Sequence, residues 1–235
     1  MRLSTLRPLL VLALLAACSR SDSTQTANAD TSAPKAASGN VGSSYVPADT
    51  ISERADRGRI LGDSTAPLWV IMASDFQCPF CKDWHDQQFE VLMHEYGMKN
   101  RVRLAFLNFP LSMHQNAMPA AETAMCSSVQ GKFWPVHEGL FATQKRWETM
   151  ANASALFDSL AAAAGVNMPL YRQCMSKHLT APLIEADRER LRAAGVRSTP
   201  TFFVGAQMLE GADKDVRAAI EAALAQGRGA KKPGN

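Results

Sequence analysis

The stretch Leu68–Cys81, LWVIMASDFQCPFC, decides the fold of this 235-residue chain. Residues 68–73 form a continuous apolar run, which favours a buried parallel strand over a short helix. From Pro79 onward, mostly apolar residues recur at helical spacing until Gly97, where a helix is expected to end. Residues 101–107, RVRLAFL, predict a second strand. The sequence therefore predicts a strand–helix–strand unit with two cysteines at its first junction.

The position of Cys78 predicts its chemistry. Proline suits the first position of a helix, because its missing N–H would be unsatisfied there, so Pro79 puts Cys78 at the helix entrance. Free backbone N–H groups and the positive end of the helix dipole favour a thiolate there and lower the pKa of a cysteine. We expect Cys78 to be the attacking sulfur and Cys81, one turn into the helix and more covered, to be the resolving sulfur.

A second β-rich segment lies near the C-terminus. Thr201–Val204 and Gln207–Gly211 are separated by two residues, one of them glycine, which predicts a hairpin directly after Thr199-Pro200. From Val216 to Leu224 apolar side chains recur at helical spacing, which predicts an amphipathic closing helix.

This order of elements resembles the thioredoxin fold, and the motifs resemble those of DsbA-like exported thiol-disulfide oxidoreductases. The resemblance extends from about residue 60 to 224 and rests on DFQCPFC (75–81), NFPL (108–111), QGKFW (130–134) and STPTFF (198–203). It implies an α/β thioredoxin fold with a helical insertion, at about residues 114–195, between the βαβ and ββα halves.

The resemblance also implies roles for individual residues. In thioredoxin-like folds the proline equivalent to Pro200 has a cis peptide bond and faces the cysteine pair, and the residue equivalent to Thr199 presents backbone groups to an extended peptide. We place Thr199, Pro200, Pro79 and Phe80 in the substrate-binding site.

One departure from the family pattern concerns proton transfer. Many relatives carry a buried carboxylate six residues before the first cysteine, where Met72 stands in this chain. Asp75 would partly substitute for it or, as turn chemistry favours, support the helix entrance. Proton transfer at Cys81 would then rely on water.

The N-terminus has the order of an export signal. Residues 1–17 carry two arginines, a short apolar run and then small residues, and the run is too short to span a bilayer. Leu15–Cys18 resembles the lipobox of bacterial lipoproteins, in which the cysteine is lipidated, and Ser19 favours the outer membrane. An incidental cysteine in a plain secreted protein is the alternative.

The odd number of cysteines, five, fits this assignment. With Cys18 given to lipid, four remain and allow three pairings. The short gap between Cys78 and Cys81 suggests that they pair locally, which leaves Cys126 and Cys174 for each other. We interpret the second pair as a structural disulfide within the insertion, contributing on the order of 4 kcal/mol. The alternative is two unlinked buried thiols.

Composition divides the rest of the chain. We expect a signal peptide at 1–17, a lipidated N-terminus and flexible tether at 18–54, a DsbA-like domain at 55–226 and a disordered tail at 227–235. Removing the signal's two arginines leaves 23 basic against 22 acidic residues. A net charge of +1 gives no general case for nucleic-acid binding.

These features predict a membrane-tethered enzyme that exchanges disulfides with exported proteins, as an oxidase. Its partners would be exported proteins with thiols or disulfides and an unidentified redox partner, and no cofactor or metal is expected. The Pro-Phe pair and the insertion favour the oxidase, whereas Thr199 also occurs in isomerases. The alternatives are a disulfide reductase or isomerase and a non-catalytic copper or zinc carrier that uses the same sulfurs.

The histidines and aromatic residues have ordinary explanations. His85 would need a fourth ligand to form a metal site with the two thiols, and none has suitable spacing, so we expect a solvated side chain. His114 and His137 are expected to pack or cap. Four aromatic residues of the insertion fit core packing as well as a peptide groove: Phe133, Trp134, Phe141 and Trp147.

Overall fold

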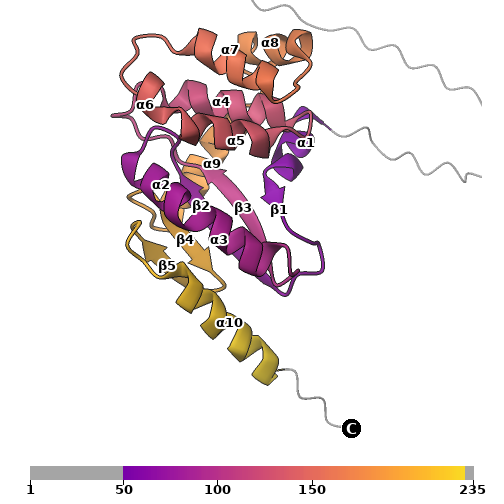
Figure 1. The fold of residues 1–235 in the computed structure, drawn as a ribbon, viewed down its shortest axis with the longest axis vertical. Helices are drawn as coiled ribbons and strands as arrows, with labels where there is room; N and C mark the ends of the chain where they lie inside the picture. The colour runs from indigo at the N-terminus through magenta and orange to yellow at the C-terminus, as the bar shows by residue number, and fades with distance from the viewer. Residues whose placement is uncertain (1–49, 231–235) are drawn as a thin grey trace, which may run out of the picture. The chain divides into compact units, whose positions relative to one another are not determined.

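The computed structural model describes residues 50–230. The expected signal peptide, the lipidation site Cys18 and most of the expected tether lie outside these residues, as do residues 231–235. The described residues form one mixed sheet with helices packed around it (Figure 1). Among the described helices, none has both the length and the apolar character needed to cross a membrane.

The sheet has the strand order β1-β3-β2-β4-β5. Its centre consists of the parallel strands β2 (Leu68–Ser74) and β3 (Val102–Asn108). β4 (Thr201–Val204) pairs antiparallel with β2 and forms the predicted hairpin with β5 (Gln207–Glu210), while the short β1 (Ile60–Leu61) pairs with β3. The predicted thioredoxin fold is confirmed.

The helix that follows Cys78 connects β2 to β3. It runs without a break through α2 (Pro79–Trp84), η1 (His85–Phe89), α3 (Glu90–Leu92) and η2 (Met93–Gly97), of which η1 and η2 are π-helical. Apolar side chains along it are buried in the core that it shares with the sheet: Cys81, Trp84, Phe89 and Leu92. This core holds the first turn of the helix, and with it the cysteine pair, at the end of β2.

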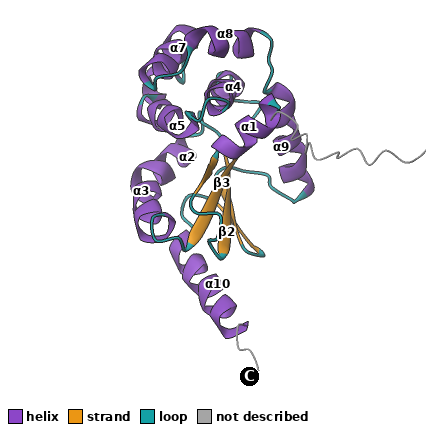
Figure 2. Ribbon diagram, turned by 90° about the vertical axis from the view of Figure 1, so that its right-hand side faces the viewer, coloured by secondary structure: helices purple, strands orange, loops and turns teal. Residues whose placement is uncertain are grey.

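The predicted helical insertion lies between β3 and β4. It consists of α4 (Ala117–Ser128), α5 (Phe133–Ala142), α6 (Gln144–Trp147), α7 (Ser154–Ala163), α8 (Met168–Ser176) and α9 (Ala181–Ala193). α4 is almost wholly buried, because it packs against α5, α7, α8 and α9. Figure 2 shows α4, α5, α7 and α8 beyond one end of the sheet, with α3 and α9 on opposite sides of it.

Two predicted boundaries are wrong. α1 (Ile51–Gly58) begins within the expected tether, because Thr50 and Glu53 cap it reciprocally: each side chain accepts a hydrogen bond from the other's backbone N–H, at 3.2 and 2.7 Å. At the other end, α10 (Val216–Ala230) continues into the expected tail, since its alanine-rich sequence propagates the helix across single glycines.

A buried ion pair joins three elements on one side of the sheet. Arg59, directly after α1, forms a bidentate pair with Asp187 of α9, and both side chains are buried. Asp187 also accepts a hydrogen bond from the backbone N–H of Asn108, at the end of β3, at 3.1 Å. The pair therefore fixes the insertion against the strand that runs beside the cysteine-bearing β2.

Candidate active site

Asp75 shapes the turn between β2 and α2. Its buried carboxylate accepts hydrogen bonds from the backbone N–H groups of Gln77, at 2.7 Å, and Leu111, at 2.9 Å. It also contacts Nδ1 of His114 at 2.7 Å, and this hydrogen bond raises the pKa of His114. The Cys78 N–H donates to the Asp75 carbonyl at 3.1 Å. Asp75 therefore acts in turn chemistry and positions Cys78 directly before the helix.

Gln144 of the insertion fixes the turn between β2 and α2 by hydrogen bonds. The buried Nε2 of Gln144 donates to the carbonyl oxygens of Phe76, at 2.7 Å, and Cys78, at 3.0 Å. Nothing in the sequence singled out Gln144, because its two partners lie more than sixty residues away in the chain. It is a positioning residue that the sequence analysis missed.

Cys78 lies at the N-cap of α2, and Pro79 occupies the first turn, as predicted. The pKa of Cys78 is lowered to about 6, mainly by a hydrogen bond from the Cys81 thiol. Burial opposes this effect, and Thr199 adds a smaller lowering of the pKa. Burial raises the pKa of Cys81 well above its ordinary value. At neutral pH the pair therefore consists of one thiolate and one thiol.

Cys81 is the more covered sulfur, as expected, but the two cysteines differ little in exposure. Cys78 is only 3% exposed and Cys81 2% exposed. Cys78 is covered because its Sγ packs against Thr199, to whose carbonyl oxygen the protonated thiol donates at 3.4 Å. The neighbouring Phe80 is 62% exposed. Charge, and not exposure, therefore distinguishes the two sulfurs in this conformation.

The structure brings Thr199 and Pro200 to the cysteine pair. The Thr199–Pro200 peptide bond is cis and leads directly into β4. Thr199 is buried against Sγ of Cys78. Pro79 and Phe80, which follow Cys78 in the chain, are exposed. Of the four residues that we expected to bind substrate, Thr199 thus contacts Cys78 directly, and the others adjoin Thr199 or Cys78 in the chain.

Ser74 occupies the place next to the resolving sulfur. Met72 is buried in the core, opposite Phe202, and offers no proton relay. Two residues further along β2, on the same face of the strand, the Ser74 side chain makes a hydrogen bond that lowers the pKa of Cys81 against the larger effect of burial. The two-residue period of a strand was the signal that would have identified Ser74.

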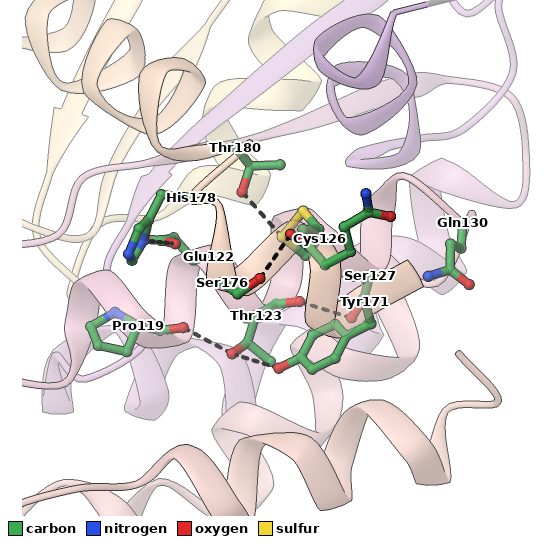
Figure 3. Close-up of a disulfide and its surroundings, with 12 residues drawn as sticks. Pro119, Glu122, Thr123, Cys126, Ser127, Gln130, Tyr171, Ser176, His178 and Thr180 are labelled. Atoms are coloured by element: carbon green, nitrogen blue, oxygen red, sulfur yellow. Dashed lines mark hydrogen bonds and ion pairs between the residues drawn. A yellow bond between two sulfur atoms is a disulfide. The ribbon is translucent and has the colours of Figure 1, made fainter. Parts of the chain in front are cut away.

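The structure joins Cys126 of α4 to Cys174 of α8 by a disulfide (Figure 3). The Cα atoms are 5.8 Å apart, and 48 residues separate the two cysteines in the sequence. Around the disulfide, Thr123 accepts a hydrogen bond from the Tyr171 hydroxyl at 3.3 Å and donates one to the Pro119 carbonyl at 2.9 Å. The bridge ties two insertion helices together away from the Cys78–Cys81 pair.

His85 of the active-site helix packs against His137 of α5. His85 is not solvated as expected: its side chain is 10% exposed and its ring stacks between those of Phe89 and Phe141. His137 is buried, and burial lowers its pKa to about 4, so the ring is neutral at pH 7. The four aromatic residues of the insertion pack in or against the core.

Comparison with known proteins agrees with this geometry. A family model described as thioredoxin matches residues 54–222. The chain belongs to the thioredoxin family. Within that family the structure is DsbA-like: it is similar to oxidised BdbD from Bacillus subtilis, with a TM-score of 0.65, 25% identity, and coverage of 72% of this chain and 94% of that one. It is also similar to DsbA from Chlamydia trachomatis, with a TM-score of 0.61, 17% identity and coverage of 79% and 97%.

Curated relatives of this DsbA-like chain carry two kinds of name. Disulfide bond formation protein D of Bacillus subtilis is 24% identical over 172 residues, which cover 70% of this chain and 76% of that protein. Na⁺/H⁺ antiporter NhaA 3 of Salinispora tropica is 29% identical over 185 residues, or 76% of this chain but 27% of that protein. The chain spans about a quarter of the length of the antiporters that it matches.

Proposed function

We propose that this protein is a thiol-disulfide oxidoreductase that oxidises exported proteins through Cys78-Pro79-Phe80-Cys81. The observation that carries the proposal is the split within the pair: the pKa of Cys78 is lowered to about 6 while that of Cys81 is raised. A low-pKa thiol is a good leaving group in disulfide exchange, so its mixed disulfides are readily resolved. The likeness to a protein named for disulfide bond formation supports the same activity.

The proposed reaction begins with the oxidised pair. A substrate thiolate attacks Sγ of Cys78, the Cys78–Cys81 bond breaks, and Cys81 leaves with the electron pair and takes up a proton. A second substrate thiolate then attacks the substrate sulfur of the mixed disulfide, and Cys78 leaves as a thiolate. The substrate gains a disulfide, the enzyme gains two electrons, and a separate redox partner must reoxidise it.

The surroundings of the pair suit this sequence of steps. The Cys81 thiol donates to the departing Cys78 thiolate, and the hydrogen bond between Cys81 and Ser74 offers the resolving sulfur a hydroxyl route for its proton. Thr199 and Pro200, together with the exposed Phe80, would hold the extended substrate chain.

Lipid anchoring at Cys18, after removal of residues 1–17, would hold the enzyme on the periplasmic side of the cell envelope, on the outer membrane as Ser19 favours. The support for this is the lipobox-like sequence, which lies outside the described residues. Replacing Cys18 by Ser is expected to release the protein into the soluble exported fraction. Retention of this variant in membranes would show that another feature anchors the protein.

The direct assay is the reoxidation of reduced, unfolded ribonuclease by the oxidised protein. We expect turnover by the wild type and by Cys126→Ser, and none by Cys78→Ser. The active-site equilibrium with glutathione sets the direction: a strongly oxidising potential supports the oxidase, and a thioredoxin-like potential supports a reductase. Tight binding of Cu(I) by the reduced pair, without thiol turnover, would favour the metal carrier instead.

A further inference from the structure

A second cluster of reactive side chains lies outside the cysteine pair, where the active-site helix meets the insertion. His85 begins η1, and His137 and Glu138 lie side by side in the sequence of α5. Nε2 of His85 is 3.1 Å from Oε2 of Glu138, and Nδ1 of His137 is 3.4 Å from Oε1. All three ligand atoms lie within 4.8 Å of one another.

His137 is a buried polar group with no well-aligned hydrogen bond among the described residues. Its Nδ1 approaches Oε1 of Glu138 at 3.4 Å, but this contact lacks hydrogen-bond alignment. Aromatic side chains surround the ring: Phe76, Phe89, Phe106, Phe133, Trp134 and Phe141. Buried polar atoms nearly always have a partner, and a neutral imidazole keeps one nitrogen with a free lone pair.

His85 is oriented as a metal ligand would be. Its Nδ1 contacts Oδ1 of Asp86 at 3.2 Å and its Nε2 contacts Oε2 of Glu138 at 3.1 Å, the second without the alignment of a hydrogen bond. In the tautomer that donates from Nδ1 to Asp86, the Nε2 lone pair faces Glu138 and is free to bind a cation. Histidines that bind metals commonly donate their other N–H to a carboxylate.

The cluster is accessible from solvent. A cavity of about 520 Å³ is lined by His85, Glu138, Asp86 and Glu90 together with apolar side chains. The Glu138 side chain is 51% exposed, so it can rotate without disturbing the core. His137 is wholly buried and does not line the cavity, so the cavity gives direct access to His85 and Glu138.

We propose that His85, His137 and Glu138 bind one Zn²⁺ ion, with water as the fourth ligand. Two imidazole nitrogens and a carboxylate oxygen are a donor set that zinc prefers. Tetrahedral bonds of about 2.0–2.2 Å put ligand atoms roughly 3.4 Å apart. Each imidazole already lies near that distance from one Glu138 oxygen, His85 from Oε2 and His137 from Oε1, so a small rotation of the carboxylate would complete the site. The bound ion would link the active-site helix to α5. The site uses neither thiol of the cysteine pair.

The test uses the oxidised full chain with Cys18 replaced by Ser, in which the other four cysteines form two disulfides and no thiolate competes for the metal. Calorimetric titration with Zn²⁺ is expected to show one bound equivalent per chain. Glu138→Gln should weaken binding by more than about tenfold, since loss of even an outer-shell partner costs about 10- to 100-fold. Glu90→Gln is the matched control: it removes the same charge from the same cavity wall and should change the affinity by less than about threefold.

Two further measurements separate a metal site from a structural cluster. Zn²⁺ should raise the thermal unfolding midpoint of the wild type and of Glu90→Gln, but not of Glu138→Gln or His85→Gln. Co²⁺ in place of Zn²⁺ should give the visible bands of a tetrahedral site with nitrogen and oxygen ligands. The proposal is overturned by absence of stoichiometric binding, by equal weakening in Glu138→Gln and Glu90→Gln, or by binding that survives in both Glu138→Gln and His85→Gln.

Discussion

The stability of the reduced protein should rise with pH because of Cys78. The folded pKa of about 6 lies below the ordinary value of 9.0, so this stabilisation is fully present above pH 9 and is lost as the pH falls through 6. Linkage between these two values gives a contribution near zero at pH 5, about 1.4 kcal/mol at pH 7 and about 2.7 kcal/mol at pH 8. At pH 7 this makes the reduction potential of the Cys78–Cys81 disulfide about 30 mV more oxidising than it would be with an unshifted Cys78.

The assay is urea unfolding at pH 5, 6, 7 and 8 with excess reductant, for the wild type and for Cys78→Ser. The second disulfide is reduced in both proteins, and both contain the same other titrating groups, so the difference between their unfolding free energies isolates Cys78. We expect that difference to grow by about 1.4 kcal/mol between pH 5 and pH 7. A difference that stays flat over this range would refute the assignment of a stabilised thiolate.

Three further predictions concern the residues that hold the site. Replacing Cys126 and Cys174 together by Ser should lower the unfolding free energy by about 4 kcal/mol, the chain-entropy value for a sequence separation of 48. The glutathione equilibrium of the active site should stay unchanged, and a shift in it would contradict a purely structural role for this disulfide. Gln144→Leu removes the side-chain donor of the Phe76 carbonyl and one of the two donors of the Cys78 carbonyl, which keeps the Lys82 N–H, and should cost about 1–3 kcal/mol in urea unfolding. A neutral effect would show that water replaces the amide. Asp187→Ala leaves the buried Arg59 guanidinium with Asp56 as its remaining carboxylate partner, so it should cost about 3 kcal/mol by calorimetry, the low end of the range for a broken buried pair. A loss below about 1 kcal/mol would show that Asp56 and solvent compensate the guanidinium.

Local sequence was enough to predict the frame of the active site. The apolar run of β2, Pro79 in the first turn of α2 and the hairpin of β4 and β5 are each determined by neighbouring residues, and each is where the pattern predicted it. The same holds for the capping box of Thr50 and Glu53, a local signal that the sequence analysis overlooked.

The parts that were missed depend on tertiary packing. Gln144 and Asp187 reach the active-site region from the insertion, and a single sequence carries no signal for pairs so far apart. The burial of Cys78 has the same origin, because Thr199 covers it from a distance of 121 residues in the chain. Fold and chemistry were therefore predictable from pattern, whereas the electrostatic environment of the sulfurs was not.

The measurement that tests the account most directly is the capture of a mixed disulfide. Reduced Cys81→Ser, treated at pH 7 with a small peptide disulfide, should form a stable adduct on Cys78, identified by mass spectrometry of its peptide. Cys78→Ser should leave Cys81 unmodified under the same conditions, because burial keeps that thiol protonated. An adduct on Cys81 that forms as fast as the one on Cys78, or no adduct on Cys78 at all, would contradict the central claim.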